Sequence, residues 1–460
     1  MWILGETLKI IDHTILGYFI FSVIVYTSLL IGSFPDIIYY FKRSKFARIH
    51  ELLESKVLPP VTIIIPAYNE HDNIYNAVQS ALNSNYQNLY VFVVNDASTD
   101  DTIEILNNHY ELHEVPAIVD QQLPCAKIKK VYVSKIHPNL MIFDKAHGGA
   151  GDSINVGLNA CFTPYFMTFD ADSIMDKFAV DELVYDMLTT RQTIAVGGGV
   201  YLLNACKYSD GKILKSLMPY KLAPAIQSCE YLRSHLFNRT GWNSFGGTMS
   251  YSGTATLFNR NIVINAGGFD TNNFAQDSEI IMRLHTYMYD KKIPHQIRFT
   301  PACSVWTDVP ATFREFAKQR DHWRRGLLRS IFRNFKLLFN PKYKIQGLWC
   351  FPNYLLLEIM APIVEFTAYL SVFIAYCFGI VNITLVILFI ILAWGFTSYI
   401  TVANMFLNLI TFNRYKKLKD VMWIFSLCFL EMCGYRQFYV LVNMWGSLHY
   451  YFNRLIGKPQ

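Results

Sequence analysis

Apolar residues gather in long runs near both ends of the 460-residue sequence, and a mixed pattern lies between them. In residues 15–34 nearly every side chain is apolar or small, close to the ~20 residues that a helix needs to cross a ~30 Å hydrocarbon core. Two more apolar stretches, residues 361–380 and 384–410, follow the mixed region. This pattern predicts membrane-spanning helices on both sides of a central domain.

The central region, residues 61–306, alternates short β-rich runs with amphipathic stretches; the runs include VTIIIP, LYVFVVND, YFMTFDAD and HQIRFTPACSVW. Such alternation predicts an α/β domain with a largely parallel sheet. Two runs end in Asp96 and Asp170, and ligands bind at the carboxyl ends of strands in such sheets. We therefore expect the site there. Residues 109–143 are interrupted by proline and predict a long excursion with short strands.

An amphipathic pattern of helical period covers residues 324–339, with basic residues opposite the apolar face. The basic residues are Arg325, Arg329, Arg333 and Lys336. The pattern favours a helix lying in the cytosolic membrane interface, ended by Asn340 and Pro341. A soluble helix on the flank of the domain is the alternative.

The distribution of basic residues predicts the orientation. Positive charge follows the first apolar run, whereas a cleaved signal peptide carries it in front. The residues concerned are Lys42, Arg43, Lys45 and Arg48, and a second basic group is formed by Arg414, Lys416, Lys417 and Lys419. Because positive flanks stay in the cytoplasm, we expect an outward N-terminus, a cytoplasmic central domain and a hairpin made by the later runs.

The last apolar stretch, residues 421–445, carries Glu431 and Arg436 in its middle. It either spans the membrane or dips and returns, which leaves the side of the C-terminus open. Glu358 and Glu365 belong to the same region, and such groups are costly when they face lipid. They form either a buried ion pair or the lining of a polymer tunnel.

Composition narrows the possible partners. The net charge is only +6, and the basic residues lie near apolar segments without interleaved aromatic residues, which favours anionic lipid and excludes nucleic acid as the expected partner. Nine cysteines are scattered without a CxxC pair. Neither a disulfide framework nor a zinc site is indicated, and a reducing compartment fits.

A candidate metal site follows the apolar run YFMTF. Asp170 and Asp172 place two carboxylates one residue apart at a predicted strand end, a donor set suited to Mg²⁺ or Mn²⁺. Alone this triplet is a weak signal, because it also occurs in turns. The segment after Asp96 has an alternative explanation as well, since Ser98 or Thr99 can be a helix N-cap.

The order of the motifs is more specific than any one of them. IIIPAYNE (63–70), VVNDASTDDT (93–102), FDADS (169–173), QDSE (276–279) and QRDHW (319–323) resemble the ordered motif set of family 2 glycosyltransferases. With the membrane segments, the chain is similar to the synthases of poly-N-acetylglucosamine, hyaluronan, chitin oligosaccharides and cellulose. The resemblance implies a GT-A-type, Rossmann-like domain, a UDP-sugar donor and inversion at the anomeric carbon.

On this resemblance the chain divides into four parts. We expect a transmembrane anchor in residues 1–41, the cytosolic GT-A domain in residues 55–323, an amphipathic interfacial helix in residues 324–345 and a C-terminal transmembrane region in residues 353–450. The protein would then be a multi-pass protein of the cell membrane.

The resemblance also implies roles for single residues. Asp277 matches the general base, and Asp170 with Asp172 matches the metal site. Donor contacts are expected for Asp96, Asp170 and Gly149, and acceptor contacts for Ser252, Gly253, Gln319, His322 and Trp323. Two alternatives remain open: Asp277 is also a suitable helix N-cap, and Trp323 is also a suitable interfacial anchor.

Three positions depart from the family pattern. Ala150 stands where relatives carry lysine, Gln276 where they carry glutamate, and His322 where they carry arginine. The first and third lose a cation, and histidine lacks the bidentate fork of arginine. Contact with the diphosphate then depends on a substitute, for which the candidates are Arg320, Arg324 and Arg325.

The sequence therefore predicts an inverting, metal-dependent enzyme that moves a sugar from a UDP-sugar to a growing polysaccharide and carries the product outward. The expected partners are the donor, a glycan acceptor, the lipid bilayer and accessory export subunits. Two alternatives stand beside this: transfer of a single sugar to a polyprenyl phosphate, and an inactive scaffold subunit of an export complex, which the three departures support.

Overall fold

The computed structural model describes residues 2–46, 58–412 and 417–456, and its largest element is a ten-stranded sheet. Of the predicted basic residues, Arg48, Arg414 and Lys416 lie outside the described residues. The strands are β1 (Val61–Ala67), β2 (Leu89–Asn95), β3 (Leu112–Val115), β4 (Ile128–Ser134), β5 (Leu140–Lys145), β6 (Tyr165–Thr168), β7 (Ser173–Met175), β8 (Thr193–Leu202), β11 (Thr256–Asn259) and β12 (Gln296–Thr307). Their order is β3-β4-β5-β2-β1-β6-β11-β8-β12-β7.

The sheet is mixed. Strands β5, β2, β1 and β6 are parallel neighbours, as the sequence predicts. Strands β8 and β12 are a further parallel pair, whereas β11 is antiparallel to both β6 and β8, and β7 is antiparallel to β12. The expectation of a largely parallel sheet is therefore correct for β5, β2, β1 and β6 and for β8 with β12, and wrong for the rest of the sheet. The predicted excursion supplies β3 and β4, which extend the sheet beyond β5.

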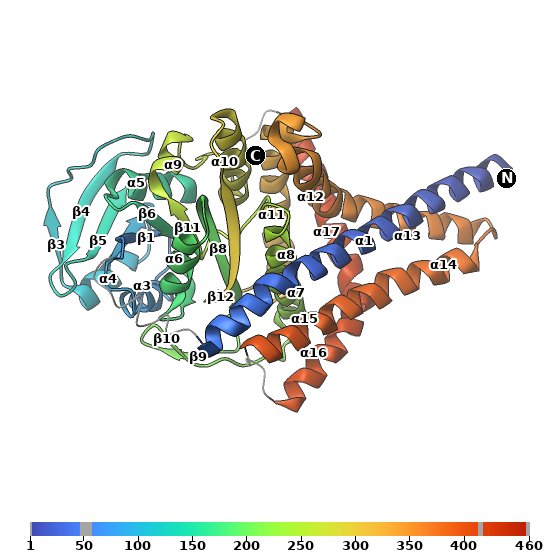
Figure 1. Ribbon diagram of the computed structural model, residues 1–460, viewed down its shortest axis with the longest axis horizontal. Coiled ribbons are helices and arrows are strands. Elements are labelled where there is room, and N and C mark those ends of the chain that lie inside the picture. The colour runs from blue at the N-terminus through green and yellow to red at the C-terminus, as the bar shows by residue number, and fades with distance from the viewer. Residues whose placement is uncertain (1, 47–57, 413–416, 457–460) are drawn as a thin grey trace.

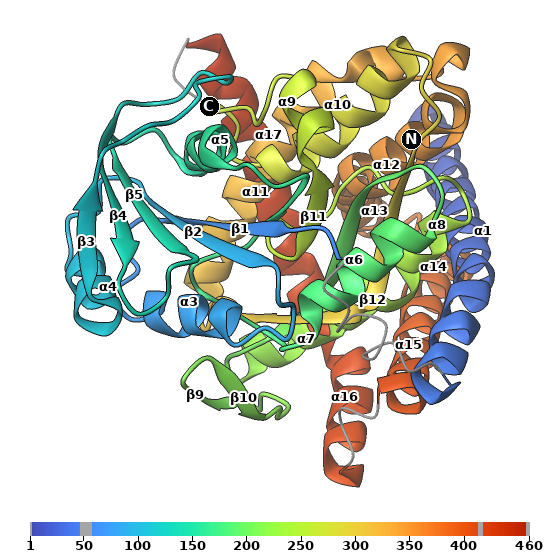
Figure 2. The same ribbon diagram turned by 60° about the vertical axis from the view of Figure 1, so that its left-hand side comes forward.

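Helices cover both faces of the sheet (Figures 1 and 2). They are α3 (Ile74–Leu82), α4 (Thr102–Tyr110), α5 (Ala150–Ala160), α6 (Ala179–Thr189), α7 (Leu222–Arg233), α8 (Arg239–Asn243), α9 (Arg260–Asn265), α10 (Gln276–Asp290) and α11 (Phe313–Arg333), with a hairpin of β9 (Lys207–Ser209) and β10 (Lys212–Lys215) at the edge. Figure 2 shows α3 and α4 below β1 and β2 and α5 above them.

The run VTIIIP is almost wholly apolar because its strand is covered on both faces. Ile63 and Ile65 of β1 point into the core beneath α3 and α4, and Ile64 points into the core beneath α5 and α10. All three side chains are fully buried. Burial of each contributes on the order of 1.5–3 kcal/mol relative to exposure.

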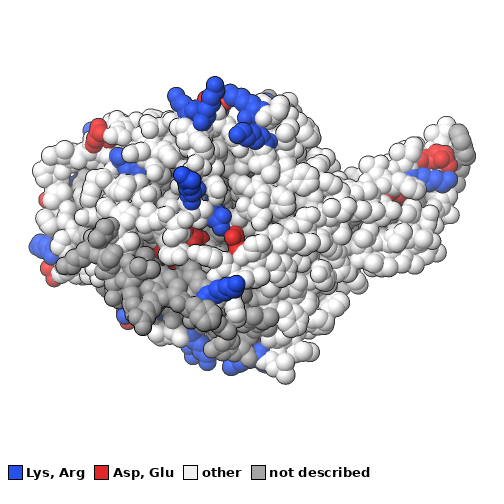
Figure 3. Space-filling model, viewed as in Figure 1, with Lys and Arg blue, Asp and Glu red and all other residues white. Residues whose placement is uncertain are grey.

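The remaining long helices extend away from the layered domain (Figure 1). They are α1 (Trp2–Phe46), α13 (Ala361–Cys377), α14 (Ile383–Ile390), α15 (Phe396–Phe412), α16 (Leu418–Leu430) and α17 (Arg436–Leu455). Within the part of the chain that the structure describes, three stretches are long and apolar enough to cross a membrane: Gly5–Lys42, Gln346–Cys377 and Ile383–Leu407. On the face seen in Figure 3, charged side chains gather over the layered domain and at the outer tip, and the region between is almost uncharged.

The helix expected from residue 324 begins earlier, at Phe313, so that QRDHW lies inside α11. A capping box starts it: Thr312 Oγ1 accepts from the Glu315 amide, and the Glu315 carboxylate accepts from the Thr312 amide, both at 3.2 Å. The helix ends at Arg333, before the predicted end at Asn340. Its residues Leu328 and Ile331 are buried, so part of its apolar face packs inside the protein.

The chain between α16 and α17 turns sharply. Cys433 (φ −96°, ψ 77°) and Gly434 (φ 97°, ψ −42°) leave the helical conformation, so the last apolar stretch is two helices and not one. Glu431 accepts from Arg233 at 2.6 Å, and Glu365 pairs with Arg436. All four charged residues also line a cavity of about 340 Å³ between α1, α13 and α15. These charged residues therefore form buried ion pairs and also line a cavity, so the two alternatives left open by the sequence do not exclude one another.

Helix α1 is fixed to the domain through α8. A methyl group on Gly241 would lie 2.3 Å from the backbone oxygen of Leu29, so the two helices touch through their main chains. Ser244 Oγ also donates to the carbonyl of Gly32 at 2.7 Å.

We therefore expect Gly241→Ala to destabilise the protein by about 1–3 kcal/mol, because the added methyl group must displace backbone. Thermal unfolding of the detergent-solubilised protein measures this. Gly17→Ala is the matched control in α1, since its methyl group would meet no atom within 4 Å. Equal melting temperatures for the two variants would contradict the main-chain contact between α1 and α8.

Candidate active site

Four carboxylates converge beyond the carboxyl ends of β1 and β6. Glu70 follows β1, Asp170 and Asp172 follow β6, and Asp277 lies in the first turn of α10. The three aspartates line a cavity of about 500 Å³. Because β1 and β6 are parallel neighbours, the loops that follow them open at the same edge of the sheet.

Asp170 and Asp277 face one another over Gly253. A methyl group on Gly253 would lie 3.9 Å from Asp170 Oδ1 and 3.8 Å from Asp277 Oδ2. Ser252 and Gly253 line the cavity, as expected for the acceptor side. The space above Gly253 is thus bounded by the expected base on one side and the expected metal ligand on the other.

Hydrogen bonds fix two of the carboxylates. Asp172 Oδ1 accepts from Ser173 Oγ at 3.1 Å and from Thr307 Oγ1, at the end of β12, at 3.2 Å. Asp277 Oδ1 accepts from the Ser278 amide at 2.8 Å. The N-cap of α10 is Ala275 and no side chain caps the helix, so Asp277, its second residue, is not the N-cap that the sequence allowed, and it lines the cavity.

The four carboxylates repel one another. Burial, followed by the charges of Asp172, Asp277 and Glu70, raises the pKa of Asp170 well above its ordinary value. Burial and the charge of Asp172 raise the pKa of Glu70 to about 7. A divalent cation relieves such repulsion, and hard carboxylate oxygens are the donors that Mg²⁺ and Mn²⁺ prefer. Asp170 and Asp172 therefore fit a metal site.

Asp96 lies elsewhere, under the turn that precedes α5. Its carboxylate accepts from the amides of Gly148 and Gly149, each at 2.8 Å, and pairs with Lys145. Neither Asp96 nor Gly149 lines the catalytic cavity. Gly149 has a positive φ of 87°, a conformation that glycine adopts at little cost, and the turn depends on it.

Lys145, at the end of β5, lies beside the same turn. It is fully buried, pairs with Asp96 and with Asp152 (2.7 Å), and so keeps a cation beside this turn. Sequence reasoning did not single it out. The available signal was a lysine that ends the apolar strand LMIFDK.

Aromatic rings stand beside Asp96. Tyr68 is 49% exposed, and its ring centroid is 5.2 Å from that of His147. Asn69 ties this loop to the one after β2, because its side chain accepts from the Thr99 amide at 2.8 Å and its amide donates to Ser98 Oγ at 3.0 Å. An exposed ring on a rigid loop is suited to stacking, so Tyr68 joins the candidate donor residues.

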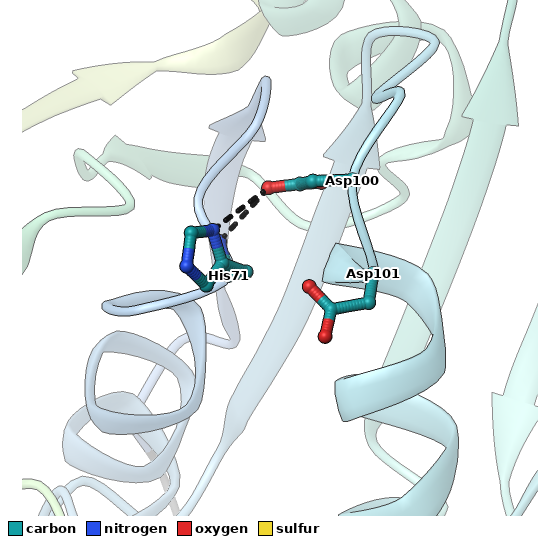
Figure 4. A group of neighbouring side chains, drawn as sticks. All are labelled: His71, Asp100 and Asp101. Atoms are coloured by element: carbon teal, nitrogen blue, oxygen red, sulfur yellow. Dashed lines mark hydrogen bonds and ion pairs between the residues drawn. The ribbon is translucent and has the colours of Figure 1, made fainter.

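A second group of possible metal ligands, His71, Asp100 and Asp101, lies on the surface nearby (Figure 4). Asp100 is already engaged, since it accepts from the amide and the hydroxyl of Thr102 at the start of α4 (3.1 and 2.6 Å). These bonds explain the cluster as a helix cap and a loop contact.

The QRDHW segment is only partly in the cavity. Gln319 and Trp323 line it, and His322 does not. The ring of His322 lies 4.2 Å from that of Phe274. Burial and the charge of Arg325 lower the pKa of His322, so it is neutral at pH 7.

The three arginines considered as substitutes for an arginine at position 322 all donate hydrogen bonds to other side chains. Arg320 donates to Glu230 at 2.7 Å, Arg325 donates to Asp321 at 3.0 Å, and Arg324 donates to Ser447 Oγ at 2.8 Å. Arg239, from α8, lines the cavity as well. Sequence reasoning missed it, because no motif contains it.

The departure at Gln276 has a local explanation. With its amide nitrogen turned toward the carbonyls of Phe274 and Asn273, it donates to both, at 2.9 and 3.1 Å. A glutamate would bring a carboxylate against two carbonyl oxygens. Glutamine therefore suits this turn before α10.

Fold and site together define a glycosyltransferase of the GT-A fold. The structure resembles that of the mannosyltransferase PcManGT from Pyrobaculum calidifontis, described in complex with GDP-Man and Mn²⁺, with a TM-score of 0.52, 17% identity, and coverage of 93% of this chain and 98% of that one. Residues 62–264 match the family described as glycosyl transferase family 2, and residues 165–398, more than half of the chain, match glycosyl transferase family group 2. The chain belongs to the family 2 glycosyltransferases.

Two curated relatives are similar in sequence. A probable glycosyltransferase of Bacillus subtilis, YdaM, is 26% identical over 61% of this chain and 59% of its own length. The poly-beta-1,6-N-acetyl-D-glucosamine synthase of Staphylococcus aureus is 25% identical over 62% of this chain and 60% of its own length. The chain thus matches about three-fifths of the length of these relatives.

We expect Asp172→Asn to abolish turnover and to weaken metal-dependent UDP binding by at least ~10-fold, since even loss of a residue that only supports a metal ligand costs that much. Calorimetric titration of UDP with and without Mn²⁺ measures it. Asp101→Asn, in the surface cluster, is the matched control and should keep wild-type metal dependence. If Asp101→Asn lost the metal dependence of UDP binding and Asp172→Asn kept it, the metal site would have to be assigned to the surface cluster instead.

Gly253→Ala should fold normally, because its methyl group meets no atom closer than 3.8 Å. We expect transfer to fall at least ~10-fold, because reacting atoms must approach to about 3–3.5 Å in the space that the methyl group takes. UDP affinity and turnover measured on one preparation separate the two effects. Undiminished turnover would show that the acceptor does not pass over Gly253.

Proposed function

We propose that this protein is an inverting, metal-dependent glycosyltransferase that moves a sugar from a UDP-sugar to a growing polysaccharide. The observation that carries the proposal is the pairing of Asp277 with Asp170 across Gly253, in one cavity with Gln319 and Trp323. A base, a metal ligand and an acceptor surface are thereby within reach of one reacting carbon.

In the proposed reaction, an acceptor hydroxyl attacks the anomeric carbon of the donor, and the bond from this carbon to the diphosphate oxygen breaks. UDP leaves with the bonding electrons, and Asp277 takes the hydroxyl proton. Asp170 and Asp172 would hold the divalent ion that neutralises the diphosphate. Trp323 offers a flat surface for a sugar ring, and Arg320 stacks on it at 4.5 Å.

We propose UDP-N-acetylglucosamine as the first donor to test. Support comes from the similarity to a poly-N-acetylglucosamine synthase. Asp96, Gly149 and Tyr68, around the turn before α5, are proposed to receive the nucleoside. His322 is proposed to act by packing against Phe274, and not by contact with the acceptor.

We further propose a multi-pass protein of the cell membrane with a cytoplasmic catalytic domain. The apolar helices and Lys42 at the inner end of the first span support this orientation. The catalytic cavity and the cavity between the membrane helices share Glu230, Arg320 and Glu358, which supports outward passage of the product. Accessory export subunits would bind outside these cavities.

One experiment tests the proposal against its rivals. Detergent-purified protein is given a panel of UDP-sugars with Mn²⁺ or Mg²⁺, and UDP release and product size are measured. Polymer supports the proposal, and a single sugar on added polyprenyl phosphate would support the lipid acceptor. If no donor gave UDP release, the result would favour the alternative that the protein is an inactive scaffold subunit.

Asp277→Asn should leave UDP affinity nearly unchanged and lower kcat by at least ~10²-fold, the usual loss on removing a positioned base. Titration with UDP and steady-state kinetics measure the two quantities. Asp290→Asn, a surface change at the other end of α10, should retain wild-type kcat. Near-normal turnover in Asp277→Asn would exclude Asp277 as the general base.

A further inference from the structure

Arg239 enters the catalytic cavity from a rigid support. Asn243, at the end of the same short helix, donates to Asp36 of α1 at 2.6 Å and to the carbonyl of Phe299 at 2.9 Å, and accepts from the Phe299 amide at 2.9 Å. The Arg239 guanidinium lies 5.9 Å from the centre of the Phe299 ring. Contacts on both sides thus hold α8, and Arg239 with it, against the cavity.

No hydrogen bond or ion pair satisfies Arg239 Nη1 among the residues that the structure describes. The other arginines of the cavity, Arg320 and Arg324, donate to Glu230 and Ser447, although Arg320 Nε also lacks a partner among the described residues. Burial lowers the pKa of Arg239, which reflects the same lack of solvation. A guanidinium taken out of water without a partner is destabilised, so binding of a ligand that completes its hydrogen bonds would be favourable here.

Two unpartnered acceptors accompany it. Asn238 Oδ1 and Gln319 Oε1 belong to residues that line the same cavity, and both are buried without a hydrogen bond in the described structure. Arg320 Nε and the Tyr251 hydroxyl, from two further lining residues, also lack a partner in the described structure, so the wall offers two N–H donors, two acceptors and one hydroxyl group. A sugar hydroxyl both donates and accepts, so sugar hydroxyls match this mixed set.

The charge of the cavity restricts the ligand further. Six carboxylates and three guanidinium groups line it. An anionic sugar would meet net repulsion even with a cation bound by Asp170 and Asp172, whereas neutral hydroxyl groups can accept from Arg239 and donate to the carboxylates. This balance favours an uncharged acceptor.

We propose that Arg239, with Asn238 and Gln319, binds the terminal sugar of the acceptor through its hydroxyl groups, and that this wall selects neutral glycans over those that carry carboxylates. The assignment rests on the proposed function, since it places the acceptor beside Asp277. It adds to that function two acceptor-binding residues and the acceptor class.

The test uses the full-length protein in detergent with the donor that releases UDP. The acceptor probes are a neutral N-acetylglucosamine tetramer and a tetramer of alternating N-acetylglucosamine and glucuronic acid. We expect wild type to prefer the neutral probe. Arg239→Gln should raise the KM for this probe at least ~10-fold, should send a larger share of UDP release to water, and should keep the affinity for UDP with Mn²⁺. Arg239→Lys should recover part of the loss.

Asn238→Ala is the second variant and should raise the same KM if Arg239→Gln does not fold. Exposed Arg191→Gln is the matched control and should resemble wild type. An unchanged acceptor KM in Arg239→Gln or Asn238→Ala, or an equal loss of UDP affinity, would overturn the assignment. A wild type that prefers the glucuronic acid probe would overturn the acceptor class. No UDP release by wild type from any donor would instead reject the proposed function itself.

Discussion

The mutual repulsion of buried carboxylates is the constraint on which this structure depends. Glu70, Asp170, Asp172 and Asp277 meet at one edge of the sheet, where burial raises the pKa values of all four and neighbouring carboxylate charges raise those of Asp170 and Glu70 further. Only a rigid scaffold keeps such groups together, and the parallel pair β1 and β6, covered on both faces, supplies it. The fold thus holds buried carboxylates together at an electrostatic cost, which the proposed divalent cation and the proton of the proposed acceptor would lower.

The membrane helices complete the wall opposite these carboxylates. Helix α11 brings Gln319 and Trp323 to the cavity and packs against α17, while α8 brings Arg239 and packs against α1. The acceptor wall is therefore built from elements that are tied to the apolar helices. In the proposed mechanism, movement of α1 or α17 relative to the sheet would change the distance between the acceptor and Asp277, and the rate of such a reaction depends steeply on the positions of the reacting groups.

Sequence reasoning succeeded where a signal is local. The run VTIIIP predicts a strand, which the structure confirms as β1, and Asp170 and Asp172 follow a predicted strand end. Asp277 lies at the start of a predicted helix. Sequence reasoning failed where the signal is a contact between distant segments. The pairing of Lys145 with Asp96 and the position of Arg239 depend on tertiary packing, and no spacing in the chain reveals them. His322 shows the same limit, because the rotation of one helix decides whether a side chain faces the cavity or Phe274.

Two of the three departures from the family pattern have structural explanations that fit an enzyme. Gln276 donates to two carbonyl oxygens, and His322 packs as a neutral ring against Phe274. Nothing in the structure explains Ala150. Each change alters the surroundings of the reaction and leaves the carboxylates in place. A scaffold without a bound cation would gain stability by losing Asp170 or Asp172, because each buried like charge destabilises the folded state. Retention of all of them is costly unless a cation and a substrate bind.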